Sequence, residues 1–120
     1  MAPGPYGGPT SQSRSLSFNV SPDSARVTDL RFILTATCDP GWTMQDTAWN
    51  GSWTIRPDRT FGGDFSRQTG ADSYTGTMKG TFDPVSGNAS GTMHVDWTWG
   101  TDKGPLHCST GDVSWTALKQ

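Results

Sequence analysis

The residue types that favour helices are scarce or missing in this chain. All eleven acidic residues are Asp, so Glu is absent, and only three of the nine basic residues are Lys. Glu and Lys are good helix formers, whereas Asp, Thr, Ser and Gly are poor ones. A chain of 120 residues that avoids the first group and is rich in the second predicts an all-β protein.

Charge of one sign and long apolar runs are also lacking, and their absence excludes two classes of partner. The formal net charge is −2 and the isoelectric point is near 5.4, so the chain lacks the basic surface that binds nucleic acid or an anionic membrane. No segment approaches the ~20 consecutive apolar residues of a membrane-spanning helix. We therefore expect neither nucleic acid nor membrane as a partner.

The first thirteen residues are rich in Pro, Gly and small polar residues and lack the apolar stretch of a signal peptide. This composition is typical of a linker that follows an added start Met. We therefore expect residues 1–13 to be a linker and residues 14–120 to form a single β-sandwich domain, which suits this length. A linker-like start also indicates a domain tethered to another one in a longer secreted protein.

Cysteine is limited to Cys38 and Cys108, which lie 70 positions apart and beside predicted strands. The two could meet across the fold as a disulfide, which on the chain-entropy model contributes about 4 kcal/mol of stability. The alternative is a pair of buried thiols in a cytosolic protein. Because no metal or redox spacing is present, we favour the disulfide and an extracellular location.

What the chain does contain is period-two alternation of apolar residues, interrupted by turn residues. The alternation predicts seven strands, near residues 15–20, 26–38, 53–55, 61–65, 74–82, 89–99 and 113–117. Residues 39–50 and 100–107 are expected as loops. Seven short strands in this order predict an antiparallel β-sandwich, jelly-roll or immunoglobulin-like, or a flattened barrel.

Three glycines lie inside the predicted strands. Gly76, Gly80 and Gly91 interrupt segments that otherwise alternate regularly, and Gly weakens a strand unless a close neighbour needs the space. We expect large aromatic side chains of adjacent strands to occupy that space.

Short motifs that recur in one kind of secreted domain are spread along nearly the whole chain. They are YGGPTSQ from Tyr6 to Gln12, VTDL from Val27 to Leu30, Cys38, SGT from Ser90 to Thr92, and CSTGDVSWTA from Cys108 to Ala117. Together these motifs resemble an uncharacterised secreted all-β domain type of actinobacteria. The resemblance implies secretion, an all-β fold, a Cys38–Cys108 bridge and a role as an accessory domain beside another module. It implies no activity and no catalytic residues.

Six tryptophans are more than the core of so small a domain needs, because each indole buries a large area. Trp53, Trp97 and Trp115 alternate with apolar residues and are expected in the core. Trp99 shares a face with Trp97 and is also a core candidate, although its place at the end of the strand could put it at the rim. The others lie in or beside polar loops, where an indole stacked on a sugar ring and polar groups on its hydroxyls would make a saccharide site. The expected ligand-binding residues are Trp42, Trp49, Trp99, Gln45, Asp46, Asp102 and Lys103.

This set predicts a non-catalytic carbohydrate-binding module of a secreted bacterial protein, a monomer that binds a polysaccharide and needs no cofactor. The alternative for Trp42 and Trp49 is that they fold back and close one open end of the sandwich. Loop tryptophans are also hot spots of protein interfaces. A secreted protein-interaction, adhesion or inhibitor domain is therefore the second hypothesis.

Candidates for catalysis or metal binding are few. Four of the eleven Asp residues lie beside Pro in turn contexts, where Asp bonds its own backbone: Asp23, Asp39, Asp58 and Asp83. His94 and Asp96 share the polar side of one strand and are the candidate pair for a weak metal site or a small hydrolase, although a solvated strand face is the ordinary interpretation. No Gly-x-Ser-x-Gly motif occurs, and His107 lacks further ligands at zinc spacing. A structural Ca²⁺ ion is compatible with this Asp-rich composition, but the spacing locates no site for it.

Overall fold

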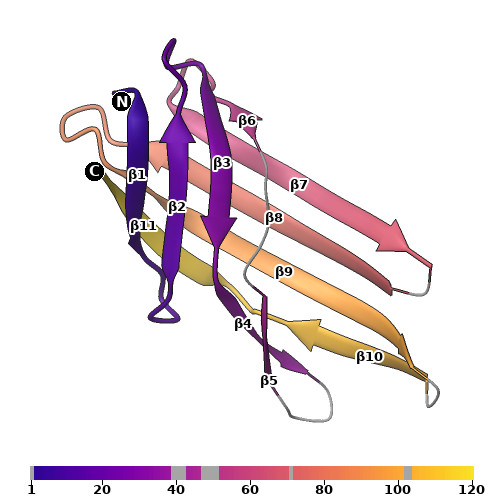
Figure 1. Ribbon diagram of the computed structural model, residues 1–120. Coiled ribbons are helices and arrows are strands. Elements are labelled where there is room, and N and C mark those ends of the chain that lie inside the picture. The colour runs from indigo at the N-terminus through magenta and orange to yellow at the C-terminus, as the bar shows by residue number, and fades with distance from the viewer. Residues whose placement is uncertain (1, 39–42, 47–51, 71, 102–103) are drawn as a thin grey trace.

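The computed structural model describes residues 2–38, 43–46, 52–70, 72–101 and 104–120, with the backbone alone at 43–46, Thr69, Thr101 and Pro105. Within these ranges the chain consists of strands joined by turns and contains no helix (Figure 1), as the composition predicted. The described residues therefore include no helix with the length and hydropathy needed to cross a membrane. The strands are β1 (Gly4–Pro9), β2 (Ser15–Val20), β3 (Arg26–Phe32), β4 (Leu34–Cys38), β5 (Thr43–Asp46), β6 (Trp53–Thr54), β7 (Thr60–Thr69), β8 (Asp72–Phe82), β9 (Ala89–Thr101), β10 (Gly104–Ser109) and β11 (Val113–Lys119).

All of these strands join in one antiparallel sheet that curls into a half-barrel. The order is β5-β4-β10-β9-β11-β1-β2-β3-β6, and β8 and then β7 continue from the other edge of β9. β9 is long enough to pair with β11 through its first half and with β10 through its second half. β1, β2 and β3 lie across one half of the β7–β11 layer and leave its other half uncovered by them (Figure 1). We refer to the side of β7–β11 that faces β1–β3 as the inner face.

The core lies between β1–β3 and the half of β7–β11 beneath them. The Phe18 ring stacks on Tyr6, with ring centroids 5.2 Å apart. It also meets Phe61, Phe82 and Trp115 edge to face, at centroid distances of 5.8 to 6.1 Å. All five rings are buried, and aromatic rings of this size contribute much of the apolar area that a small domain can bury.

β1 overturns the expected boundary between linker and domain. Gly4–Pro9 pairs with β2 on one side and with β11 on the other, and the Tyr6 side chain is only 1% exposed. One of the glycines that suggested a linker, Gly8, serves close packing instead, because an added Cβ there would lie 2.0 Å from the Thr116 carbonyl oxygen. The ordered sheet therefore begins at Gly4 and not at residue 14.

Two other expectations about strand limits were also wrong. The strand predicted over residues 26–38 is divided, because β3 pairs with β2 whereas β4 pairs with β10 and β5. Residues 39–50 and 100–107, both expected as loops, contain β5 and most of β10. In the sequence of β10, GPLHCS, only Leu106 and Cys108 alternate with polar residues, and a pattern this short does not indicate a strand by itself.

The packing predicted for the three strand glycines is confirmed. An added Cβ would lie 2.4 Å from the Phe65 ring at Gly76, 2.3 Å from the Phe61 ring at Gly80, and 2.8 Å from the Trp115 indole at Gly91. Each glycine therefore leaves room for an aromatic ring of the neighbouring strand.

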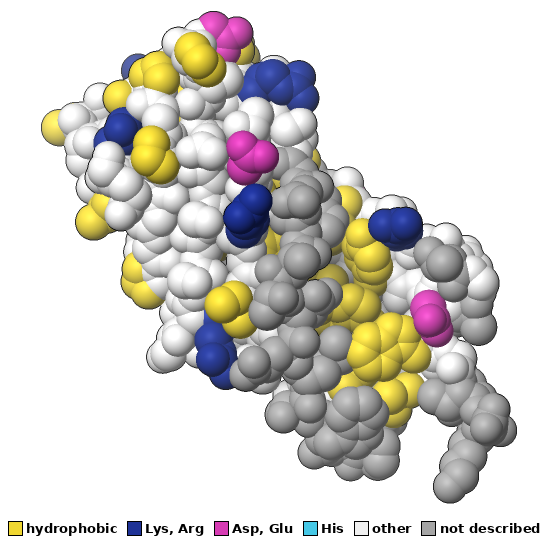
Figure 2. Space-filling model, in the orientation of Figure 1, with side chains coloured by type: hydrophobic (Ala, Val, Ile, Leu, Met, Phe, Trp, Pro, Cys, Tyr) yellow, Lys and Arg dark blue, Asp and Glu magenta, His cyan; other side chains and the backbone are white. Residues whose placement is uncertain are grey.

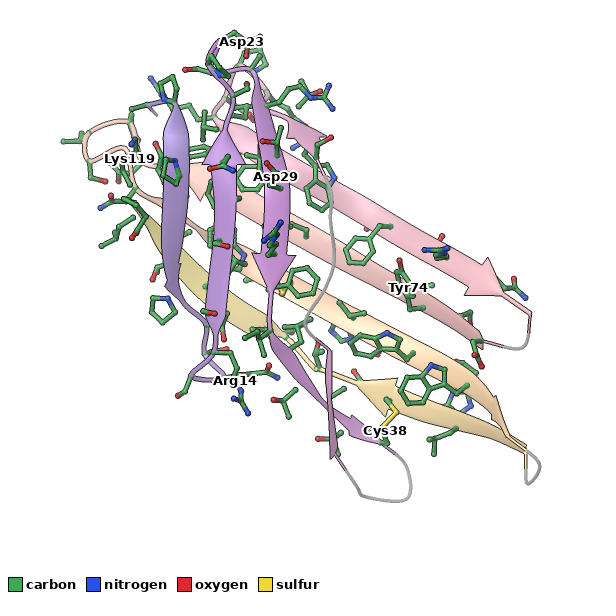
Figure 3. The ribbon with its side chains drawn as sticks, viewed as in Figure 1. Arg14, Asp23, Asp29, Cys38, Tyr74 and Lys119 are labelled. Carbon is green, nitrogen blue, oxygen red and sulfur yellow. A yellow bond between two sulfur atoms is a disulfide. The ribbon has the colours of Figure 1, made fainter. Side chains whose placement is uncertain are left out.

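Cys38 and Cys108 form the predicted disulfide. The two residues are direct partners in the β4–β10 ladder, and both are buried, with exposures of 1% and 3%. Figure 3 shows the sulfur–sulfur bond at Cys38, at the end of β4. A buried disulfide indicates an oxidising environment of the extracellular type.

Candidate functional site

Most of the ligand-binding residues expected from the sequence lie outside the described part of the chain. Trp42, Trp49, Asp102 and Lys103 are in the ranges that the structure does not describe. The backbone of Gln45 and Asp46 lies in β5, opposite Thr35 and Leu34 of β4, but their side chains are not described. Trp99 is the member of the expected set whose surroundings are described.

Trp99 belongs to a group of aromatic side chains that follows the strands from β6 to β9. This aromatic row consists of Trp53, Phe65, Tyr74, Trp97 and Trp99. Ring centroids are 6.3 Å apart between Trp53 and Phe65 and 6.2 Å apart between Phe65 and Tyr74. Tyr74 is the direct strand partner of Trp97. Since alternate residues of a strand share one face, Trp99 lies on the same side of β9 as Trp97.

The members of the aromatic row on β7, β8 and β9 lie on the half of the inner face that β1–β3 leave uncovered, and Trp53 of β6 packs on Phe65 beside them. Tyr74, seen in Figure 3, lies to the side of these strands and not beneath them. Figure 2 shows hydrophobic side chains gathered on this face, over the parts of β7–β10 that lie beyond β3. Leu106, the strand partner of Trp99, extends the apolar surface onto β10.

The rings of the aromatic row differ in burial. Trp97 is buried, with 7% of its surface exposed, whereas Trp53, Phe65, Tyr74 and Trp99 are partly buried and pack against the core. This confirms the core assignment of Trp97 and Trp115. It corrects that of Trp53, which lies at the margin of the core because β6 is a two-residue strand at the end of the ladder.

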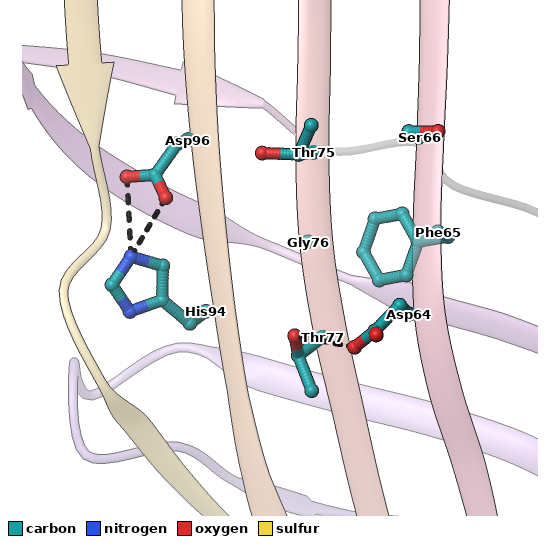
Figure 4. A pocket seen from close by; sticks show the side chains of 8 residues that line it. All are labelled: Asp64, Phe65, Ser66, Thr75, Gly76, Thr77, His94 and Asp96. Atoms are coloured by element: carbon teal, nitrogen blue, oxygen red, sulfur yellow. Dashed lines mark hydrogen bonds and ion pairs between the residues drawn. The ribbon is translucent and has the colours of Figure 1, made fainter.

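The opposite, outer face of β7–β9 carries a shallow polar depression (Figure 4). Asp64 and Ser66 of β7, Thr75 and Thr77 of β8, and His94 and Asp96 of β9 line it. The Thr77 hydroxyl donates a hydrogen bond of 3.0 Å to the Asp64 carboxylate. The depression therefore presents hydroxyl, carboxylate and imidazole groups to solvent.

His94 lies between two carboxylates in this depression. Its Nδ1 is 3.0 Å from Asp112 Oδ1 and its Nε2 is 3.0 Å from Asp96 Oδ2. The hydrogen bonds to Asp112 and Asp96 raise the pKa of His94 above its ordinary value. The imidazole is 38% exposed and both carboxylates are more exposed, so solvent screens much of the attraction.

His94 also has a serine neighbour that sequence reasoning missed. Ser109 Oγ lies 3.4 Å from His94 Nε2, so Ser109, His94 and Asp112 follow the order of a hydrolase triad. Asp96 lies closer to the same Nε2, however, and Ser109 Oγ accepts a hydrogen bond of 3.1 Å from the Gly111 amide. This geometry favours a hydrogen-bonded, solvated strand face. The described residues contain no His, Cys and Asp cluster suited to a metal ion.

The turn role predicted for the aspartates is confirmed at three positions. Asp23, Asp58 and Asp83 each accept a hydrogen bond from a backbone amide two residues further on, as Asp does in turns. Hydrogen bonds lower the pKa of all three carboxyl groups, with the largest contributions coming from Ser21, Thr60 and Ser86 respectively. These residues form turns and belong to neither surface described above.

Comparison with known proteins supplies no site by analogy. No protein-family model, no curated protein and no solved structure matches this chain. The functional interpretation therefore depends on the geometry of its own residues.

Proposed function

We propose that this protein is a non-catalytic carbohydrate-binding module of a secreted bacterial protein, in which a polysaccharide contacts the aromatic row. The observation that carries the proposal is the set of partly buried rings, Phe65, Tyr74 and Trp99, on the half of the inner face beyond β1–β3. Partly buried rings are held in place by the core and still offer surface to a ligand. The buried disulfide supports secretion.

Polar side chains beside the aromatic row fit a sugar ligand. Arg67 is the strand partner of Tyr74, and Asp72 lies two residues before Tyr74 on the same side of β8. Both side chains are exposed. A saccharide needs this combination, because its C–H face stacks on aromatic rings while its hydroxyl groups hydrogen-bond to charged and amide groups.

Retention on insoluble polysaccharides tests the proposal. The protein is incubated with cellulose, chitin, xylan, mannan and peptidoglycan, and the bound fraction is measured. Trp99→Ala should weaken binding to the retained polymer by roughly tenfold or more, as loss of an aromatic contact does in other interfaces. Because the Trp99 ring is only partly buried, the melting temperature should fall little. Trp42→Ala and Trp49→Ala extend the test to the two remaining tryptophans.

Val85→Ala is the matched control for non-specific adhesion. Val85 is the most exposed large hydrophobic residue that the structure describes, with 95% of its surface accessible, and it lies in the β8–β9 turn away from the aromatic row. Its removal should leave retention unchanged. If no polymer retains the protein while a pull-down from culture supernatant captures a protein through Trp99, the interaction-domain hypothesis replaces this one.

A further inference from the structure

β7 exposes a long edge of the sheet. The strand covers ten residues and pairs with β8 along one side only. Arg56 occupies the start of the other side, where its backbone amide donates to the Thr60 carbonyl at 2.8 Å and its guanidinium donates to the Gly62 carbonyl at 2.7 Å. Beyond Gly62 no other strand adjoins this side within the described part of the chain.

The backbone groups of three residues point outward from this edge. The Thr60 and Gly62 carbonyls point away from β8, since both accept hydrogen bonds from Arg56. Backbone groups of alternate strand residues point to the same side. The backbone N–H and C=O groups of Asp64, Ser66 and Gln68 therefore also point away from β8. Their three amides and three carbonyls have no hydrogen-bond partner among the described residues. A row of six such groups is a template for another strand.

We propose that β7 pairs with β7 of a second copy of this chain, antiparallel and with the twofold axis at Ser66. Ser66 then faces its own counterpart, and Asp64 faces Gln68 of the second copy. Each of these opposed residues exchanges two backbone hydrogen bonds with its partner. The register satisfies all six outward groups in both copies, and it departs from the monomer expected from the sequence.

Neighbouring registers are worse for identifiable reasons. An axis at Phe65 sets Gln68 opposite Gly62, whose carbonyl already accepts from Arg56. Axes at Asp64 and at Arg67 bring two carboxylates or two guanidinium groups face to face, and like charges directly opposite destabilise a ladder. The axis at Ser66 avoids all three problems.

The side chains of β7 are complementary in this register. On the outer face the Gln68 amide of one copy can donate to the Asp64 carboxylate of the other. On the inner face Arg67 lies opposite Phe65 of the other copy, where a guanidinium can stack on the aromatic ring. Asp64, Ser66, Arg67 and Gln68 are all exposed in one copy alone. Asp64 and Arg67, which would repel their own counterparts in the registers with the axis at those residues, therefore make favourable contacts when the axis lies at Ser66.

Cross-linking through a cysteine at the axis tests the contact directly. In Ser66→Cys the two cysteines face each other across a hydrogen-bonded pair, whose Cα atoms lie about 5.5 Å apart, within disulfide range. Mild oxidation at low micromolar protein should give a covalent dimer. Thr75→Cys is the matched control, because Thr75 is the exposed β8 partner of Ser66 but lies away from the edge. Equal cross-linking of both variants would overturn the proposal.

Sedimentation equilibrium of charge variants tests the register. Gln68→Lys places a cation opposite Asp64 of the second copy and should tighten the dimer, whereas Gln68→Asp should weaken it, each by roughly 2- to 30-fold in Kd for two pairs. Ser66→Pro removes an outward amide and should give monomers with an unchanged circular dichroism spectrum. The proposal fails if the protein stays monomeric up to about millimolar concentration, or if a dimer persists unchanged in Ser66→Pro.

Discussion

At the scale of single residues, the protonation of His94 determines how strongly its imidazole is attracted to the two carboxylates beside it on the outer face of β9. A protonated imidazole attracts both Asp112 and Asp96 at 3.0 Å, and a neutral one loses most of that attraction. Because the folded pKa of His94 is raised, the protonated form contributes stability that is fully present below the unfolded pKa of about 6.5. That contribution disappears as the pH rises through the folded value.

We therefore predict that His94→Gln costs most at acid pH. The difference in melting temperature between the protein and His94→Gln should be largest near pH 5.5 and should shrink toward about pH 8.5, where the imidazole is neutral. The effect should be small, and smaller still in high salt, because all three groups are well exposed. Thermal unfolding followed by circular dichroism over this pH range gives the comparison.

His107→Gln serves as the control for that experiment. Among the described residues the His107 ring contacts the Thr98 hydroxyl, at 3.2 Å, and no carboxylate, so its replacement should not reproduce the trend. A pH-independent difference for His94→Gln would show that the imidazole contributes only by packing.

At the scale of strands, the β8–β9 hairpin depends on glycines that allow close approach. An added Cβ at Gly91 would lie 1.8 Å from the Lys79 carbonyl oxygen as well as near the Trp115 ring. Backbone cannot move aside as a flexible side chain can. Gly91 is paired with Gly80 of β8 and with Trp115 of β11, so a shift at Gly91 would disturb two ladders.

We predict that Gly91→Ala destabilises the protein by about 1–3 kcal/mol, in the range of other overpacked sites. Gly63→Ala is the matched control in β7, because among the described residues its added Cβ would meet only Trp53 Nε1, at 3.9 Å, and its φ is not positive. That change should be neutral or slightly stabilising. Denaturant unfolding of both variants measures the difference, and equal effects would contradict the close-approach explanation.

Alternation predicted the strands that bury one face, and it failed where a strand is held by its neighbours. β2, β8, β9 and β11 follow their apolar pattern, and the buried side of β9 was predicted correctly. β1, with the sequence GPYGGP, has no such pattern and is fixed by β2 and β11. Composition alone assigned it to a linker.

The same limit applies to the candidate site. His94 and Asp96 could be placed on one strand face because they are two residues apart. The approach of Ser109 could not be predicted, since it depends on the β9–β10 register and β10 was not recognised. The aromatic row was also missed as a unit, because Phe65, Tyr74 and Trp99 come from three strands whose alignment the sequence does not encode locally.

At the scale of the whole molecule, the disulfide fixes one end of the curled sheet. Only Thr37 and Cys38 of β4 pair with β10, and β5 joins the sheet through β4. The bond therefore supplements a short ladder. It also spans 70 positions of the chain, so it strongly restricts the unfolded ensemble.

We predict that replacing both cysteines by Ala lowers the free energy of unfolding by about 4 kcal/mol, the chain-entropy value for a loop of this length. Guanidinium unfolding of the double variant should show a lower midpoint. Hydrogen exchange should be faster at the β4 amides than in β1 and β2, because β4 loses its covalent attachment. If the hydrogen-exchange rates rose equally in β4, β1 and β2, the disulfide would stabilise the protein only by restricting the unfolded chain.

The first and last strands are neighbours in the ladder. Tyr6 is paired with Lys119, and the backbone amide of Gln120 donates a hydrogen bond of 2.9 Å to the Pro5 carbonyl. Both ends of the chain lie at the same side of the molecule (Figure 1). The start of β1 and the end of β11 are thus only about one interstrand spacing, near 4.8 Å, apart. If the segment from β1 to β11 were inserted into a surface loop of another protein, the two ends of that loop would therefore be separated by only this small distance.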